Sequence, residues 1–235
     1  MRPIPGVTRP AQLGRGTRRV FLQSATLLAS HAMTGRASAQ EAPGSVGLFE
    51  AGADVGRVEI PGGVVHDEQT GVYRITGAGE NMWFATDAFH FVYRKLSGNV
   101  RLASDIAFEG EGKNPHRKAV LMLRQSLDAD AAYIDIAVHG DGLTSMQFRG
   151  AKGANTQELQ FGKPAPSRAE LVRDGNLVWV RLDGEAMRLG GRSVRMENFL
   201  RGEIYAGLGV CSHEAAVSET ALFRNVDLVL QPPQR

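Results

Sequence analysis

The chain has 235 residues, too few for two ordinary enzyme domains with linkers and about right for one all-β domain preceded by a leader. Residues 1–39 contain six arginines and no acidic residue, so the remaining chain has 21 basic and 25 acidic residues, a net charge of −4, and no nucleic-acid partner is expected. The single cysteine, Cys211, excludes an intrachain disulfide framework and a multi-cysteine zinc or iron–sulfur site.

The first 39 residues have the order of a cleavable export signal. Arg18 and Arg19 precede Val20-Phe21-Leu22 and an apolar run from Ala25 to Met33, and Ala37 and Ala39 occupy positions −3 and −1 of a cut after Ala39. The paired arginines resemble a twin-arginine signal, and the apolar centre is shorter than the roughly 20 residues of a membrane span. The sequence therefore predicts a periplasmic protein without a transmembrane segment, whose signal peptide, residues 1–39, is removed.

The rest of the chain is predicted to form one β-sandwich. Residues 40–47 are polar and contain Pro and Gly, which indicates a tether, residues 48–230 are assigned to the sandwich, and residues 231–235 form a tail. Short runs alternate apolar and polar side chains between turn sequences such as Asp174-Gly175 and Asp183-Gly184. This alternation is typical of antiparallel sheets with one buried face per strand, and it predicts an all-β jelly-roll β-sandwich of two antiparallel sheets.

The clearest pair of strands, residues 133–139 and 144–149, flanks the turn Gly140-Asp141-Gly142. Successive side chains of a strand point to opposite faces, so each strand divides into a core face and an outward face. The predicted core face contains Ile134, Ile136, Val138, Met146 and Phe148. The opposite face then contains Tyr133, Asp135, His139, Gln147 and Arg149.

The same division of other runs gives one outward face that is rich in histidine, arginine and aromatic groups. Two glycines in the middle of the run 206–213, Gly207 and Gly209, indicate that another group approaches that strand closely. A sheet face that is merely solvated is the alternative interpretation, although such a face more often carries Lys, Glu, Thr and Ser. The predicted ligand-binding residues are Asn81, Trp83, His90, Arg124, Tyr133, Asp135, His139, Gln147, Arg149 and His213, with Glu80 beside them.

Several segments resemble the concanavalin A-like lectin/glucanase superfamily. They are Gly79-Glu80-Asn81-Met82-Trp83-Phe84, Asp87-Ala88-Phe89-His90-Phe91 and residues 114–122 and 133–142. The resemblance covers roughly residues 48–230, and it is closest to small bacterial jelly-roll domains found alone or joined to Tol-type β-propellers. It implies two stacked sheets whose concave sheet holds carbohydrate, sometimes a structural calcium ion nearby, and an envelope protein as a possible partner. The closely spaced glutamate pair of the superfamily's glucanases is missing from the chain.

The candidate chemistry follows from the residue types on the predicted face. Asp135, His139 and Glu80 are the catalytic candidates, because a glycosidase needs two carboxyl groups facing one groove. His90, His139 and His213 are predicted either to converge on a metal ion or a substrate or to make unrelated local hydrogen bonds. Trp83 is either a stacking platform for a sugar ring or a core residue.

These observations favour a periplasmic carbohydrate-binding jelly roll that uses its concave sheet. A glycan-active hydrolase or lyase on the same face is the alternative, and an envelope-protein interaction module is a third possibility. No cofactor is expected apart from a possible structural calcium ion.

Overall fold

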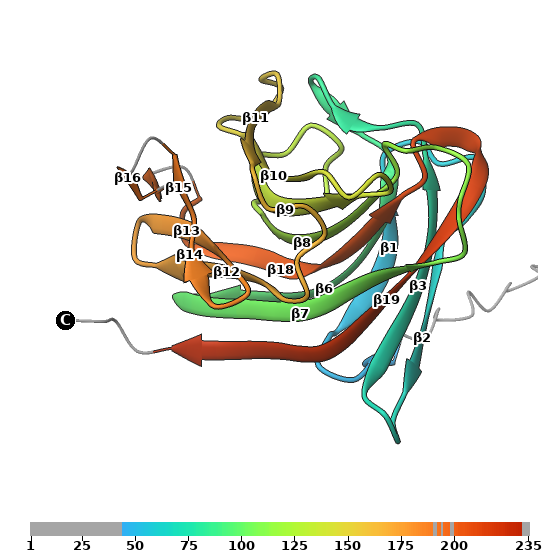
Figure 1. Cartoon of the computed structure of the whole chain (residues 1–235), viewed down its shortest axis with the longest axis horizontal. Coiled ribbons are helices and arrows are strands. Elements are labelled where there is room, and N and C mark those ends of the chain that lie inside the picture. The colour runs from blue at the N-terminus through green and yellow to red at the C-terminus, as the bar shows by residue number, and fades with distance from the viewer. Residues whose placement is uncertain (1–43, 190–191, 194, 198–199, 232–235) are drawn as a thin grey trace, which may run out of the picture. The chain divides into compact units, whose positions relative to one another are not determined.

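The computed structural model describes residues 44–189, 192–193, 195–197 and 200–231. The predicted signal peptide, residues 40–43 of the predicted tether and residues 232–235 lie outside these ranges, so their boundaries stay predictions. The described residues form strands and turns and no α-helix (Figure 1), and so they include no helix able to cross a membrane. The expected all-β class is confirmed.

One layer is a seven-stranded antiparallel sheet with the order β1-β6-β18-β8-β9-β10-β11. Figure 1 shows its strands following one another from β6 through β18 and β8 to β11. The strands are β1 (Ala51–Val55), β6 (Phe89–Ser97), β8 (Lys118–Arg124), β9 (Tyr133–His139), β10 (Thr144–Arg149), β11 (Gln157–Phe161) and β18 (Glu203–Cys211).

The other layer is an eight-stranded antiparallel sheet with the order β14-β13-β12-β7-β19-β3-β2, in which β17 also pairs with β13. Two short hairpins, β4–β5 and β15–β16, stand apart from both sheets. The remaining strands are β2 (Gly63–Asp67), β3 (Val72–Gly79), β4 (Met82–Trp83), β5 (Thr86–Asp87), β7 (Asn99–Glu109), β12 (Ala169–Asp174), β13 (Leu177–Leu182), β14 (Glu185–Ala186), β15 (Arg188–Leu189), β16 (Arg192–Ser193), β17 (Arg195–Glu197) and β19 (Glu214–Gln231).

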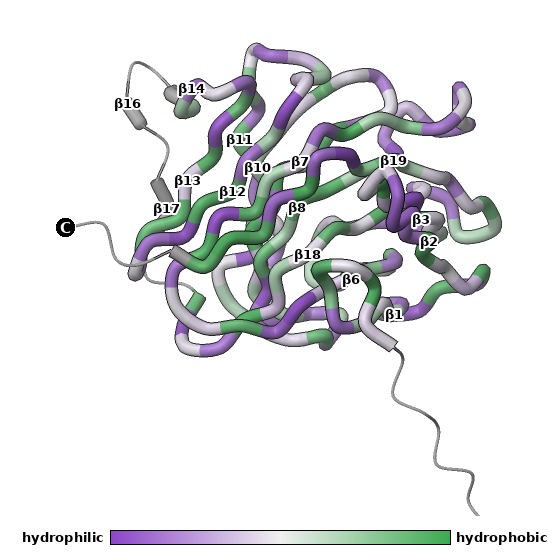
Figure 2. Tube along the Cα trace, turned by 90° about the horizontal axis from the view of Figure 1, so that it is seen from below, coloured by the Kyte–Doolittle hydropathy of each residue, from purple (hydrophilic) through white to green (hydrophobic). Residues whose placement is uncertain are grey.

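The core lies between the two sheets because the strands alternate as the sequence predicts. Figure 2 shows hydrophobic and hydrophilic residues alternating along β7 and β12. Ile134, Ile136, Met146 and Phe148 join the main core cluster, together with residues of the other sheet such as Leu102, and Val138 is buried on the same face. The predicted division of β9 and β10 into two faces is therefore confirmed.

A second apolar cluster covers the outer face of the seven-stranded sheet, the face that points away from the eight-stranded sheet. It contains Phe89, Phe91, Val120, Met122 and Ala137, and Met82 of the β4–β5 hairpin packs against it. This cluster explains why the outer face is buried rather than solvated.

The two mid-strand glycines of β18 make room for this cluster. A Cβ atom at Gly209 would lie 2.9 Å from the ring of Phe89, and one at Gly207 would lie 2.9 Å from the ring of Phe91. The predicted close approach is thus made by the protein's own aromatic rings.

Candidate functional site

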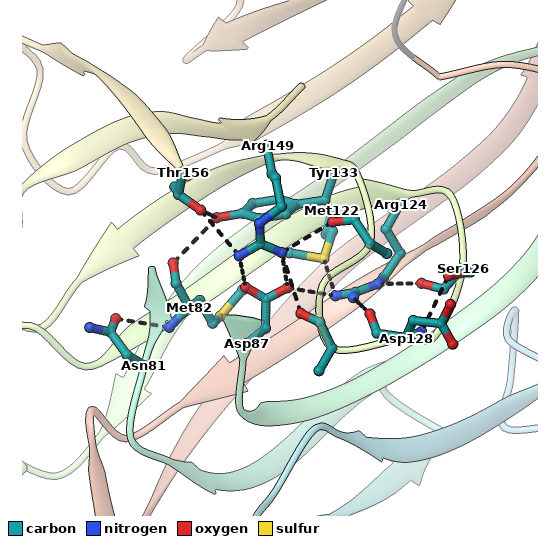
Figure 3. A network of polar contacts seen from close by, with 12 residues as sticks. Asn81, Met82, Asp87, Met122, Arg124, Ser126, Asp128, Tyr133, Arg149 and Thr156 are labelled. Carbon is teal, nitrogen blue, oxygen red and sulfur yellow. Dashed lines mark hydrogen bonds and ion pairs between the residues drawn. The ribbon is translucent and has the colours of Figure 1, made fainter. Parts of the chain in front are cut away.

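The β4–β5 hairpin is fastened to the outer face by Asp87, which is buried between two arginines (Figure 3). Arg149 makes a two-pronged contact with it, at 2.7 Å from Nη2 to Oδ1 and 2.9 Å from Nη1 to Oδ2. Arg124 Nη1 reaches Oδ2 at 3.4 Å, and both guanidinium groups are completely buried. Two buried cations therefore share one carboxylate.

The excess positive charge is met by backbone carbonyl groups. Arg149 also donates to the carbonyls of Phe84, Ala131 and Ala154, at 3.0 to 3.1 Å. Arg124 donates to those of Ser126 and Asp128, both at 2.6 Å, and burial lowers the pKa of Arg124 from its usual value. The network thereby ties two loops, residues 125–132 and 150–156, to one hairpin.

Tyr133 belongs to the same network rather than to an open surface. Its hydroxyl donates to the carbonyl of Met82 at 3.2 Å and lies 3.1 Å from Thr156 Oγ1, while its ring lies 5.0 Å from the Arg149 guanidinium carbon. Burial raises the pKa of Tyr133 well above its usual value. The prediction that Arg124, Tyr133 and Arg149 form an open ligand-binding surface is wrong, because protein groups already satisfy all three.

An open cleft of about 310 Å³ lies beside this network on the outer face. We call it the outer cleft. It is lined by Asn81, Trp83, His116, Lys118, His139, Leu143, Gln147, Glu158, Gln160 and His213. Five of the predicted binding residues, Asn81, Trp83, His139, Gln147 and His213, are thus brought together.

Lys118 is the buried cation of the outer cleft. Its residue is only 3% exposed, its Nζ donates to Asn81 Oδ1 at 3.0 Å, and it lies 5.8 Å from the centre of the Trp83 ring. Burial lowers the pKa of Lys118, while the charges of carboxylates such as Asp135 and Glu158 act in the opposite direction.

His139 is held in one tautomer by the turn that follows β9. Its Nδ1 lies 3.0 Å from the carbonyl oxygen of Leu143, so Nδ1 carries the proton and donates it. Burial and the charge of Lys118 lower the pKa of His139. With Nδ1 protonated, Nε2 is the acceptor of the ring, and it accepts a long hydrogen bond, 3.5 Å, from the Gln147 amide nitrogen.

Gln147 links two carboxyl groups whose pKa values are shifted in opposite directions. Its amide nitrogen donates to Glu158 at 3.0 Å, and its backbone nitrogen donates to Asp135 Oδ1 at 3.3 Å. Burial raises the pKa of Asp135 well above its usual value. Burial acts in the same direction on Glu158, but hydrogen bonds from Gln160, Gln147 and Ser145 outweigh it and lower that pKa.

Asp135 lies on the outer face, as predicted, but beneath the cleft rather than in its wall. It is fully buried, and its Oδ2 has no hydrogen-bond partner among the described residues, as is also true of Gln147 Oε1. Asp135 and Gln147 are cross-strand neighbours of β9 and β10, and a protonated Asp135 would carry a donor on the side of the strand where Gln147 lies.

The histidines of the cleft are His116, His139 and His213. The ring centre of His116 lies 6.4 Å from that of His139 and 5.6 Å from that of His213. Burial, followed by the charges of Lys118 and His116, lowers the pKa of His213. Within the described ranges, no group of three His, Cys, Asp or Glu side chains is arranged to hold a metal ion.

His90 does not join this site, and its assignment to the outer face is wrong. His90 alternates with Phe89 and Phe91, which face outward, so its ring points to the other side of the sheet. There it lies against β3 of the second sheet, where a Cβ atom added to Gly77 would be 3.1 Å from the Cβ of His90. His90 Nδ1 is 2.7 Å from Asp54 Oδ1 of the neighbouring strand β1. The error arose because the aromatic residues of β6, and not the polar ones, cover the outer face.

A second depression of about 640 Å³ shares Asn81 and Trp83 with the outer cleft and is also lined by Glu80. Glu80 is exposed and does not line the outer cleft, so it forms no carboxyl pair with Asp135 there. Trp83 is half-buried and borders both hollows, so it is not a core residue.

Five residues of the outer cleft are missing from the sequence-based set: His116, Lys118, Leu143, Glu158 and Gln160. Extending the alternation of Met122 and Val120 two residues backwards places Lys118 on the outer face. Glu158 and Gln160 alternate with Leu159, which packs on the core, so predicting a strand at residues 157–161 would have placed both side chains on the outer face.

Cys211 is buried on the outer face, and burial raises its pKa to about 11, so it is unreactive.

No protein-family model matches this chain, and no curated protein matches its sequence. Among solved structures, a functionally unknown protein from Saccharomyces cerevisiae is similar with a TM-score of 0.55 at 14% identity, covering 77% of this chain and 97% of the other. A carbohydrate-binding module from Bacillus subtilis is similar with a TM-score of 0.47 at 15% identity, covering 77% and 96%. The β-glucanase of Bacillus licheniformis is similar with a TM-score of 0.47 at 12% identity, covering 77% and 92%. At these identities the likeness extends to the fold alone. The predicted all-β sandwich of two antiparallel sheets is confirmed by the two sheets themselves.

Proposed function

We propose that the protein binds a saccharide in the outer cleft. The observation that carries the proposal is the pairing of a half-buried Trp83 ring with the hydrogen-bonding groups of Asn81, Lys118, Gln147 and Glu158 around one hollow. Sugar rings have an apolar C–H face and a rim of hydroxyl groups, so an aromatic wall with fixed donors and acceptors suits them. The volume of the cleft is at the lower end of the roughly 300–1,000 Å³ typical of small-molecule sites.

The rigid anchoring of the hairpin supports the same proposal. Trp83 lies on β4, whose hairpin is fixed through Asp87 to two buried arginines, so the ring keeps its place before a ligand arrives. Preorganised contacts lose less conformational entropy on binding.

The proposal is tested by titrating the purified protein with a panel of neutral and acidic oligosaccharides in a calorimeter. Trp83→Ala is expected to weaken the affinity for any bound saccharide by about tenfold or more, which corresponds to ~1.4 kcal/mol. Val65→Ala, an exposed apolar residue of β2 on the other sheet, is the matched control and should leave the affinity unchanged. Failure of every saccharide to bind would reject the proposal and favour the envelope-protein interaction module.

A glycan-active function is the second candidate, and the fixed tautomer of His139 favours it. A neutral imidazole in a cleft, whose Nε2 accepts a long hydrogen bond from Gln147, is equipped to take a proton from a bound sugar, as a lyase requires. A hydrolase with Asp135 as acid is less compatible, because that carboxyl group does not reach the cleft. Loss of turnover with retained binding in His139→Gln would support the lyase, and absence of turnover in the unmodified protein would exclude it.

We also propose that this binding takes place in the periplasm after twin-arginine export. The proposal rests on the charged, apolar and small-residue segments of residues 1–39, which lie outside the described part of the chain.

A further inference from the structure

We infer, on the basis of the saccharide-binding function proposed above, that the saccharide carries an anionic substituent, a uronate carboxylate or a sulfate ester, that pairs with Lys118. The inference goes beyond the shape of the cleft, because it follows from a charge that the protein itself leaves without a counterion.

The buried cations of this region differ in their partners. Arg117, the residue beside Lys118, is buried with Glu219, and 2.6 Å separates Nη1 from Oε2. Arg149 has Asp87 at 2.7 Å, and Arg124 has the same carboxylate. Lys118 is as buried as these arginines, yet no carboxylate of the described residues lies within 4.0 Å of its Nζ, and Asn81 Oδ1 is its one hydrogen-bond acceptor there.

The other ionisable groups of the cleft make no direct ion pair with Lys118, although the charges of Asp135 and Glu158 favour its charged form from a distance. His139 and His213 are neutral or cationic, so they cannot neutralise an ammonium group. Glu158 is directed at the amide groups of Gln147 and Gln160, at 3.0 and 2.8 Å. The carboxyl group of Asp135 is sealed beneath the cleft.

An ammonium group with three donors and one acceptor in a buried position is costly for the free protein. An anionic substituent entering the cleft would offset this cost and accept the unused N–H groups. Lysine acts as a compact point charge and does not require the planar two-pronged geometry that arginine favours, so carboxylates and sulfate esters are both suitable.

The position of Trp83 fixes where the charge would sit on the ligand. Lys118 Nζ lies over the Trp83 ring, 5.8 Å from its centre, so a sugar unit that contacts Trp83 would also lie within reach of the ammonium group. The inferred ligand therefore has its anionic group on the sugar unit that contacts Trp83 and not on a distant unit.

The test uses two matched pairs of probes in calorimetric titrations of the purified protein. The first pair is oligogalacturonate and its methyl ester, and the second is a carrageenan oligosaccharide and its desulfated form. The unmodified protein is expected to bind the acidic member of at least one pair tenfold or more tightly than the neutral member, and the pair that shows this difference identifies the substituent. Lys118→Gln, which keeps a donor for Asn81, is expected to reduce that ratio to about one, whatever its effect on the affinity for the neutral member.

Lys152→Gln is the matched control, since Lys152 is an exposed lysine with carboxylate partners, and it should keep the full ratio. Equal binding of acidic and neutral members by the unmodified protein overturns the inference and leaves saccharide binding standing. Absence of binding by all four probes together with the wider panel overturns both. The ratio is measured on the unmodified protein first, so the inference stays falsifiable even if Lys118→Gln does not fold.

Discussion

A single residue, Asp135, shows how position within a sheet changes the chemistry of a side chain. The alternation of β9 places it correctly on the outer face, but the covering hairpin removes it from water, and burial raises its pKa. The folded protein then binds a proton that the unfolded chain releases above about pH 4, so this residue contributes less stability as the pH rises above that value. A carboxyl group of this kind opposes the stability of the fold at neutral pH.

We therefore expect Asp135→Asn to stabilise the protein at pH 7.5 and to have little effect at pH 4. The asparagine stays neutral, and its amide can donate to the unpartnered Oε1 of Gln147. Thermal unfolding of both proteins across this pH range measures the effect, with Glu111→Gln, an exposed glutamate, as control. A constant difference in Tm at both pH values would show that Asp135 is ionised in the folded protein.

At the scale of the element, the β4–β5 hairpin depends on a charge cluster that sequence patterns do not reveal. Alternation is sufficient for β8, β9, β10 and β18, because each is regular and amphipathic or buried on both faces. It is not sufficient for Arg124 and Arg149, since an arginine on a sheet face has the same signature whether its partner is a ligand or Asp87, which lies far away in the sequence. Contacts between segments that are distant in the sequence determine which of the predicted residues are available to a ligand, and these contacts cannot be read from a single sequence.

Asp87→Ala is expected to destabilise the protein by about 3–5 kcal/mol, because it leaves two buried guanidinium groups without a counterion. Urea unfolding measures the loss, and limited proteolysis between residues 81 and 88 reports whether the hairpin detaches. Asp128→Ala is the control, since this exposed carboxylate pairs with the exposed Lys152 and such pairs contribute about 0–1 kcal/mol. Similar losses for the two variants would argue that the network is not what holds the hairpin.

At the scale of the whole molecule, the proposed periplasmic location depends on residues 1–39, which precede the residues of the sandwich in the sequence. Replacing Arg18 and Arg19 with lysine is expected to leave the precursor in the cytoplasm, because the paired arginines are what a twin-arginine translocase recognises. Cell fractionation measures the distribution, and Arg9→Lys is the control. Normal export of the double variant would reject the twin-arginine assignment.

The order of strands in the two sheets also determines when this chain can fold. β18 lies between β6 and β8 in the seven-stranded sheet, and β19 lies between β7 and β3 in the eight-stranded sheet. The last two long strands of the described residues therefore each occupy an interior place, one in each sheet. Until the ribosome has made residues 203–231, β6, β7, β8 and β3 each lack one neighbour and expose unpaired backbone groups. Folding must therefore follow synthesis of nearly the whole chain, with contacts between distant segments that form slowly. The nascent chain is exposed to aggregation for that interval, and chaperone protection is most valuable then.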